Sequence, residues 1–295
     1  QNNISSTLYV SVGNGSTNSI VTSTNGITWS GLGKTIFTNQ GFGVAYNGSN
    51  LWVAVGDGTN SIATSTDGAT WIGKGTTTFS NNGYGVAYGN GLWVAVGQSD
   101  NTIATSTDGI TWTGRGASII TSYGRAVAYG NNLWVAVGAG TNTIATSSDG
   151  ITWTGRGSTI LTSYGRGVAY GNGLWVAVGN YTGASGNTIA TSTDGTTWTG
   201  RGSTIFGSGL SVAYNSGSNL FIVTLANFIC CMETIILFTD GIILNAAATK
   251  TPNDCKIDCK GWFNNNIKKI KPINPTTANN SKKNRGTNDK VFTLT

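Results

Sequence analysis

The sequence predicts an all-β fold, a β-propeller of four-stranded antiparallel blades, and three observations support this prediction. Tryptophan recurs at a constant interval, at Trp52, Trp93, Trp134 and Trp175. A second series with almost the same interval consists of Trp29, Trp71, Trp112, Trp153 and Trp198. The chain has 44 Gly, ten Trp and ten Tyr but only 9% charged residues, which is typical of short strands joined by tight turns. A constant period of about 40 residues indicates a propeller or a solenoid.

One copy of the repeat, residues 126–166, contains four predicted strands. In order, these are Val127–Tyr129, Leu133–Val137, Thr143–Ser147 and Ile151–Thr154. In the second strand Leu, Val and Val alternate with Trp and Ala, so both faces are apolar, as expected for a sheet packed between two others. Asp149 and Gly150 predict a type I′ turn before the fourth strand, because both residues tolerate positive φ. Four antiparallel strands make a propeller blade, whereas a β-helix has shorter periods.

Counting the copies predicts six blades. The first strand begins five times, at Val44, Val86, Val127, Val168 and Val212. The second strand and the turn between the third and fourth strands each occur six times. The first blade therefore lacks its first strand, which leaves an open edge that needs a partner. We expect either the C-terminal run Val291–Leu294 or a strand of a neighbouring chain to complete this blade.

The sixth copy has diverged from the others. Leu220–Phe238 is a long apolar run, and a transmembrane helix is one interpretation of it. However, the interval between Leu220 and Asp240 equals that between Leu174 and Asp194 in the preceding copy, which favours a degenerate blade. We therefore expect a propeller over residues 1–245 and a C-terminal extension over residues 246–295.

The predicted extension carries all of the basic excess. Residues 1–245 contain two Lys and five Arg against seven Asp and one Glu, a net charge of −1, whereas residues 246–295 contain nine Lys and one Arg against three Asp, a net charge of +7. A nucleic-acid partner is not expected, because the extension has few aromatic residues among its charges. The four Cys predict one or two disulfides that fix the extension to the last blade, with a zinc site as the alternative: Cys230, Cys231, Cys255 and Cys259.

The turn between the third and fourth strands carries a family resemblance. Residues 65–71 read Ser-Thr-Asp-Gly-Ala-Thr-Trp, and related copies recur along residues 1–245. This motif resembles the Asp-box (BNR) repeat of sialidase-like β-propellers, with one residue between Asp and Gly missing. The resemblance implies a structural turn in which Asp and Ser fix the backbone and Trp packs between blades, on the face opposite the sialidase active site. The corresponding aspartates are Asp67, Asp108, Asp149, Asp194 and Asp240.

The residue inventory argues against catalysis. The chain contains no His, which removes the commonest general base and the commonest metal ligand. Glycoside hydrolysis normally needs two facing carboxylates, but Glu233 is the only Glu and five of the ten Asp lie in turns. The arginine triad and Tyr nucleophile of the sialidases cannot be assigned here. We therefore expect no catalytic residues, no metal and no cofactor, with a sialidase-like hydrolase as a minor alternative.

A ring of side chains at the start of the innermost strands is the candidate binding site. Phe42, Tyr84, Arg125, Arg166 and Leu210 each lie two residues before a Val-Ala-Tyr strand. Tyr, Asn, Asp and Arg side chains can stack on and hydrogen-bond a sugar or an acidic glycan; the alternative is that these loops are simply solvated. The candidate ligand-binding residues are Tyr84, Tyr123, Arg125, Tyr164 and Arg166 on the ring, and Asp57, Asn60, Asp100, Asn101, Asn142, Tyr181 and Asn187 in the loops between the second and third strands.

A second basic series follows the tryptophans of the fourth strand, at Lys74, Arg115, Arg156 and Arg201, and we expect it to form a solvated outer rim. The sequence as a whole favours a non-enzymatic recognition or scaffold protein that binds a glycan or a surface protein. The chain starts at Gln1 rather than Met, which suggests a mature or a trimmed chain, and a lost secretory leader is one explanation. We expect a protein that is secreted or exposed on a cell or virion surface. The alternative is a structural subunit that forms homo-oligomers by strand donation.

Overall fold

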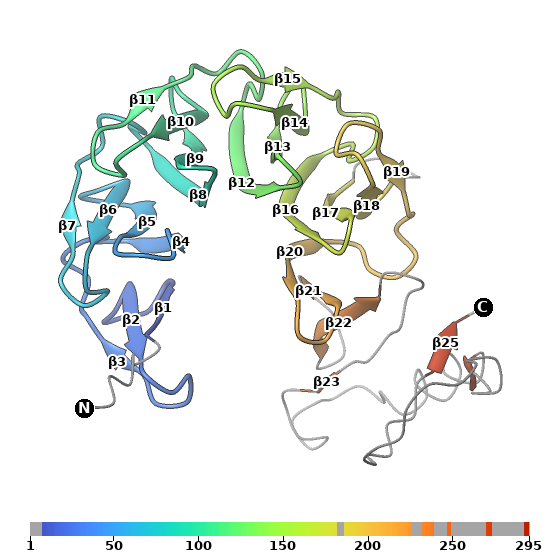
Figure 1. Ribbon diagram of the computed structural model, residues 1–295, viewed down its shortest axis with the longest axis horizontal. Helices are drawn as coiled ribbons and strands as arrows, with labels where there is room; N and C mark the ends of the chain where they lie inside the picture. Colours follow the sequence, from blue (N-terminus) through green and yellow to red (C-terminus); the bar gives the residue numbers. More distant parts are fainter. Residues whose placement is uncertain are drawn as a thin grey trace.

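The computed structural model describes residues 8–181 and 186–225, and beyond them the backbone of four further strands. Every regular element of this described part is a β-strand, and the first 23 strands form six successive blades arranged along an arc (Figure 1). The first blade comprises β1 Tyr9–Val12, β2 Ile20–Ser23 and β3 Ser30–Gly31; the second comprises β4 Gln40–Tyr46, β5 Trp52–Asp57, β6 Ile62–Ser65 and β7 Ile72–Gly73. The third comprises β8 Asn82–Gly89, β9 Leu92–Gln98, β10 Ile103–Ser106 and β11 Thr113–Gly114; the fourth comprises β12 Tyr123–Gly130, β13 Leu133–Ala139, β14 Ile144–Ser147 and β15 Thr154–Gly155. The fifth comprises β16 Tyr164–Gly171, β17 Leu174–Asn180, β18 Ile189–Ser192 and β19 Thr199–Gly200; the sixth comprises β20 Gly209–Asn215, β21 Leu220–Leu225, β22 Met232–Phe238 and β23 Ala247–Ala248.

Within each complete blade the four strands pair in chain order and antiparallel, so the first strand lies on the inner side of the arc and the fourth on the outer side (Figure 1). We call β4, β8, β12, β16 and β20 the inner strands. The inner strands of neighbouring blades lie side by side: a Cβ added to Gly85 would come within 2.9 Å of the carbonyl oxygen of Arg125. Glycine at this position therefore permits the close approach of two blades.

The inner and outer strands differ in length from the sequence prediction. The fourth-blade inner strand runs over Tyr123–Gly130 rather than Val127–Tyr129, because its pairing with β13 continues past an irregularity at residue 125. The outer strand is only Thr154–Gly155, whereas Ile151–Thr154 was expected. The other residues expected in this strand, 151–153, belong to the preceding turn instead.

The predicted type I′ turn at Asp149-Gly150 is wrong, because only Gly150 has positive φ, at 75°. The type I′ geometry is found instead between the inner and second strands. There Asn131 and Asn132 have φ of 48° and 56°, and Asn90 and Gly91 have φ of 49° and 75°. These two-residue connections match the twist of the strands they join.

The turn at Asp149 is held by side chains instead. Asp149 Oδ1 accepts hydrogen bonds from the N–H groups of Ile151 and Thr152, both at 2.8 Å, and Ser147 Oγ accepts one from Gly150 N–H at 2.8 Å. Trp153 Nε1 donates to the Gly150 carbonyl at 2.9 Å. The same aspartate bonds recur at the equivalent turns, at Asp67, Asp108 and Asp194, and Asn25 makes them in the first blade. Asp240 lies outside the described residues.

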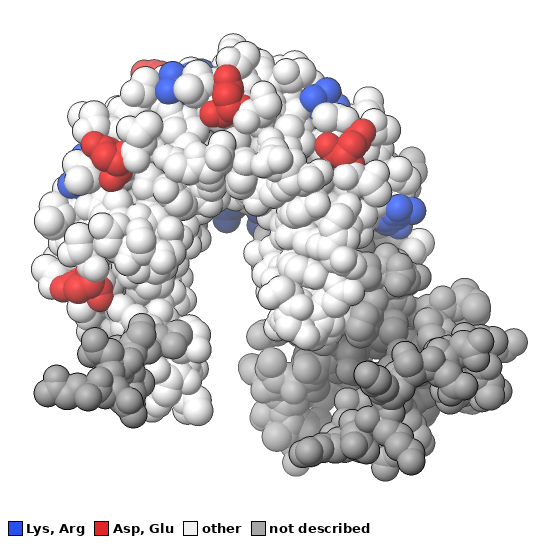
Figure 2. Space-filling view, viewed as in Figure 1, with Lys and Arg blue, Asp and Glu red and all other residues white. Residues whose placement is uncertain are grey.

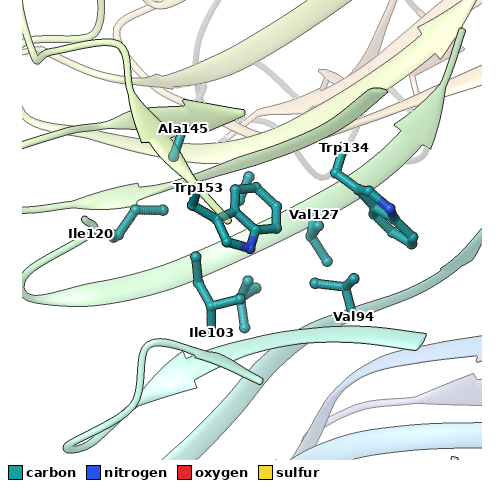
Figure 3. Packing of buried hydrophobic residues seen from close by; sticks show 9 residues of the cluster. Val94, Ile103, Ile120, Val127, Trp134, Ala145 and Trp153 are labelled. Atoms are coloured by element: carbon teal, nitrogen blue, oxygen red, sulfur yellow. The ribbon is translucent and has the colours of Figure 1, made fainter. Parts of the chain in front are cut away.

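Tryptophan joins the second, third, fourth and fifth blades to the blade that precedes each of them. Trp134 and Trp153 of the fourth blade are 1% and 8% exposed, and they pack against the third blade (Figure 3). There they meet Val94, Val96 and Ile103 in one apolar cluster. Clusters with tryptophan also join the first and second, second and third, and fourth and fifth blades, so the expectation is confirmed at these junctions. Between the fifth and sixth blades Phe221 takes the place of tryptophan.

The sixth copy forms a blade, as its spacing predicted. Leu220–Phe238 contains β21 and β22, which pair antiparallel with Leu220 opposite Phe238. The alternative interpretation of this run as a transmembrane helix is therefore wrong. Across the described residues, no helix has the length and hydropathy needed to cross a bilayer.

The first blade remains three-stranded in the described part of the chain, because β1 pairs with β2 alone. The C-terminal strand β25, Phe292–Leu294, pairs with β24, Ile270–Pro272. The expectation that Val291–Leu294 completes the first blade is thus wrong in this structure. The hollow inside the arc is open on the side between the first and sixth blades (Figure 2).

The tryptophan junction gives a first testable prediction. Trp134→Ala should destabilise the protein by about 3–5 kcal/mol, because it leaves a cavity between two blades. Trp29→Ala is the matched control, since Trp29 is 43% exposed in the first blade and its loss should cost about 0.5 kcal/mol or less. Chemical denaturation followed by tryptophan fluorescence measures both, and equal losses would contradict the assigned role of the junction.

The aspartate turns give a pH prediction. Hydrogen bonds donated by the backbone of Thr152 and Ile151 lower the pKa of Asp149 to about 2, and those from Thr111 and Ile110 do the same for Asp108. Because the folded pKa lies below the unfolded value of about 3.9, their stabilisation is complete above about pH 4 and is lost as the pH falls towards 2.

Replacing the four aspartates by asparagine, the residue at position 25, keeps the acceptor and removes the titration: Asp67→Asn, Asp108→Asn, Asp149→Asn and Asp194→Asn. Thermal melts between pH 5 and 2 should then show a clearly smaller fall in Tm for the combined variant than for the wild type. Parallel curves would show that the acid sensitivity arises elsewhere.

Candidate functional site

Each inner strand carries one residue that the sheet does not pair. The register with the second strand slips between Gly124 and Ala126, so Arg125 stands in a β-bulge. The same slip leaves an unpaired residue in the other four inner strands: Phe42, Tyr84, Arg166 and Leu210. A bulge redirects a side chain away from the regular alternation. The ring expected from the sequence is thus a row of bulge residues.

Four of these bulge residues and two paired tyrosines of the inner strands form a continuous cluster, which we call the inner-wall cluster: Phe42, Tyr84, Tyr123, Arg125, Tyr164 and Arg166. The ring centroids of Phe42 and Tyr84 lie 4.9 Å apart. Those of Tyr84 and Tyr123 lie 5.9 Å apart, and those of Tyr123 and Tyr164 lie 6.2 Å apart. The aromatic contacts therefore run across four blades in one chain.

The two arginines of the cluster stack on its rings. The Arg125 guanidinium carbon lies 4.5 Å from the centroid of Tyr84 and 5.3 Å from that of Phe42. The Arg166 guanidinium carbon lies 4.8 Å from the centroid of Tyr164, and its Nη2 donates to Tyr164 Oη at 2.8 Å. Cation–π contacts of this kind hold a guanidinium in place without neutralising its charge.

Polar residues at the ends of the second strands position this cluster, and sequence reasoning missed them. Tyr84 Oη accepts a hydrogen bond from Asn82 Nδ2 at 2.8 Å and donates to Gln98 Oε1 at 3.0 Å. Asn180 Oδ1 accepts bonds from Arg166 Nε at 3.0 Å and Ser208 Oγ at 2.8 Å. Gln98 and Asn180 occupy the same position of the repeat as Asp57, which was predicted as a site residue. Comparing the copies at this position could therefore have identified them.

The electrostatics of the cluster are those of an uncompensated cationic site. Burial lowers the pKa of Arg125, and the nearby Arg166 charge lowers it further. Burial also raises the pKa of Tyr123. Within the described part of the chain neither arginine has a carboxylate partner, and the arginines are the only charged residues of β12 and β16. Figure 2 shows basic side chains on the inner wall of the hollow and acidic ones further out along the arc.

The asparagines of the loops after the second strands are committed to the fold. Asn142 Oδ1 accepts a hydrogen bond from Gly157 N–H, and its Nδ2 donates to the Ile119 carbonyl, both at 2.8 Å. Each amide thus ties its loop both to the residues after the outer strand and to the segment before the inner strand. The same pair of bonds recurs at the three other predicted asparagines, Asn60, Asn101 and Asn187. Because both ends of each amide are used, these residues do not belong to the candidate site.

Among the described residues, none of the remaining predicted loop residues forms a hydrogen bond or ring contact with the cluster. Asp57 Oδ1 accepts a hydrogen bond from Gln40 N–H at 2.9 Å, which ties the second strand to the inner strand of its own blade. Asp100 is exposed, and Tyr181 is half-buried beside residues outside the described part. The cysteines predicted to form disulfides, Cys230, Cys231, Cys255 and Cys259, also lie outside the described residues.

The second basic series lies on the outer side of the blades. Arg156 Nε donates to Thr146 Oγ1 at 2.9 Å, and Arg115 and Arg201 make the equivalent bond to the third strand of their blades. A cleft of about 280 Å³ between the third and fourth blades is lined by Arg115, Ile119 and Trp153, among others. These arginines are separate from the inner-wall cluster and provide matched controls for it.

Comparisons with known proteins show the fold and nothing finer. No family model and no curated protein matches this chain. A structure of the nidogen/laminin complex is similar, with a TM-score of 0.60 and 11% identity, covering 84% of this chain and 95% of that one. A structure of YCF48 bound to a D1 peptide has a TM-score of 0.50 and 15% identity over 70% of this chain and 67% of that one. The designed protein Ika8 gives 0.49 and 13% over 71% and 63%.

The chain is a β-propeller. At these identities the likeness concerns the architecture alone, and it agrees with the all-β blades described above. The expected relation to the Asp-box family is not tested by these matches and stays a prediction, as does the division into residues 1–245 and 246–295.

The asparagine bonds give a third prediction. Asn142→Ala should cost about 1–3 kcal/mol, because it leaves the Gly157 N–H and the Ile119 carbonyl without partners. Asn142→Asp keeps the acceptor and loses only the donor, so it should retain part of that stability. Urea unfolding measures both variants, and an alanine variant as stable as the wild type would show that water replaces the amide at no cost.

Proposed function

We propose that this propeller is a non-enzymatic binding protein that holds an acidic segment of a partner protein on the inner-wall cluster. The observation that carries the proposal is the pair of half-buried arginines, Arg125 and Arg166, with no carboxylate beside them in the described part of the chain. We also propose that the protein works at a cell or virion surface.

The cost of an unpaired charge supports an acidic ligand. Removing a guanidinium from water is unfavourable unless an opposite charge or hydrogen-bond acceptors replace the water. Within the described part of the chain Arg125 contacts two aromatic faces and no hydrogen-bond acceptor, which leaves its N–H donors available to a ligand. A carboxylate fits such a planar fork of donors and forms charge-assisted hydrogen bonds with it.

The aromatic part of the cluster supports a protein ligand. Phe42 lies at the uncharged end of the row, next to Tyr84 and Arg125. An extended segment could therefore place a carboxylate on the arginines and an apolar side chain against Phe42. Two propellers of similar fold are known with a peptide or a protein bound, YCF48 with a D1 peptide and the nidogen/laminin pair, which agrees with a binding role for this architecture.

Binding rather than catalysis also follows from the chemistry of the cluster. It contains phenols and guanidinium groups but no carboxylate, and the whole chain has no His. The phenols are the only general acid–base groups in this set, and burial raises the pKa of Tyr123, which makes it less suited to proton transfer near neutral pH. An acidic glycan is the second ligand class that tyrosine and arginine could recognise, and the experiment below distinguishes it from a protein segment.

The fourth prediction tests the site. A displayed library of short random peptides selected on the purified chain should enrich Asp and Glu, and the amide version of a selected peptide should bind at least tenfold more weakly, since a charged hydrogen bond contributes about 1.5–3 kcal/mol. Arg125→Ala should weaken binding of the acidic peptide by a similar factor. Arg156→Ala, the same change on the outer side, should leave affinity unchanged.

Three outcomes would contradict the proposal. These are a library without acidic enrichment, equal losses for Arg125→Ala and Arg156→Ala, and no peptide binding together with tight binding on an array of acidic glycans. In the third outcome the cluster would remain a binding site, but its ligand would be a sugar acid.

A further inference from the structure

Among the described residues the place beside β1 in the first blade is empty, and three positions of the repeat mark it. The second strand of every other blade is covered by an inner strand, whereas β1 is half-exposed and pairs with β2 alone in the described part. The glycine that follows the last Val of the second strand shows the difference. A Cβ on Gly138 would meet the Tyr123 carbonyl oxygen of the inner strand, and one on Gly97 would meet that of Asn82. A Cβ on Gly13 would meet nothing within 4 Å.

An aromatic ring without its partner marks the same place. In five blades the Tyr of the inner strand packs against the aromatic residue of the second strand. The ring centroids lie 4.5 to 5.0 Å apart, in the pairs Tyr46–Trp52, Tyr88–Trp93, Tyr129–Trp134, Tyr170–Trp175 and Tyr214–Phe221. Tyr9 is the equivalent second-strand residue of the first blade and is 46% exposed. The position that would hold its partner is empty in the described structure.

The third sign is a displaced amide. In the other blades the asparagine after the second strand donates Nδ2 to a backbone carbonyl of the segment before the inner strand, as Asn142 does to Ile119. Asn18 keeps the acceptor half of this arrangement, receiving Gly33 N–H at 2.8 Å. Its Nδ2 donates instead to the adjacent Thr17 Oγ1. The empty place therefore extends past the strand to the segment that precedes it.

We propose that this place binds an extended segment of another polypeptide, which completes the first blade by adding a strand to β1. The five occupied positions define the chemistry of that segment. It carries an aliphatic or aromatic residue that is buried near Asn18, then small residues alternating with Val, and finally a Tyr that stacks on Tyr9. Residues 36–46 and 119–129 show this pattern within the protein itself.

Strand addition suits this edge, because main-chain hydrogen bonds supply affinity and alternate side chains supply specificity. The bulge position of the added strand would lie next to Phe42, at the uncharged end of the inner-wall cluster. Both bound segments would lie near Phe42, but the arginines serve only the acidic segment and Tyr9 serves only the added strand, so either binding event can fail without the other.

A synthetic peptide with the sequence of residues 119–130, labelled with fluorescein, tests the inference on the full chain. Saturable binding by fluorescence anisotropy is expected, together with slower hydrogen exchange at the amides of Val10–Val12. Tyr9→Ser in the protein, or Ser in place of the peptide's final Tyr, should each weaken binding about tenfold through loss of the aromatic pair. Ile110→Ser, which changes an exposed residue in a distant turn, should have no effect.

The inference is overturned if the peptide does not bind, or if Tyr9→Ser and Ile110→Ser bind it equally. It is also overturned if the peptide binds only after residues 286–295 are deleted, because the chain's own end would then occupy the place. Arg125→Ala should leave binding of this peptide unchanged. Failure of this test therefore remains distinguishable from failure of the acidic-peptide test.

Discussion

The junction between neighbouring blades is the interaction on which the rest of this structure depends. At four of the five junctions tryptophan of one blade packs against the blade before it, as Trp134 and Trp153 do against Val94 and Val96, and Phe221 takes this place at the fifth. Neither blade could bury these faces alone, so the repeat is stable only as a row. The same packing sets the inner strands side by side, and this brings Phe42, Tyr84 and Arg125 together although they belong to three successive copies of the repeat.

The architecture could be predicted from the sequence because its signal is periodic. The spacing of tryptophan predicted the blades, and the match between Leu220–Phe238 and the preceding copy predicted a sixth blade within an apolar run. Local geometry was less accessible. The turn at Asp149 resembles a hairpin signal in its two residues, but the carboxylate and Ser147 satisfy the backbone in another way. Side-chain hydrogen bonds thus stabilise a turn whose backbone geometry differs from the type I′ geometry that the two residue types suggested.

The candidate site was predicted in part. Its arginines and tyrosines occupy two positions of the repeat, two residues apart, and were found from those positions. The bulge that redirects Arg125 depends on pairing with the second strand, which no local pattern of residues reveals. Loop asparagines such as Asn142 were predicted to face a ligand because their amides can bind a sugar, yet the fold uses both ends of each amide. The type of a residue shows which ligands its side chain can bind. Only the hydrogen bonds of the folded chain show which of its groups remain free to bind one.

A crystal structure of the chain with a selected acidic peptide tests the central claim most directly. The account predicts a peptide carboxylate within hydrogen-bonding distance of Arg125 and Arg166, on the inner side of β12 and β16, with the blade junctions unchanged. A peptide seated on the outer side of the blades, or arginines already paired with an acidic residue of the chain itself, would contradict it.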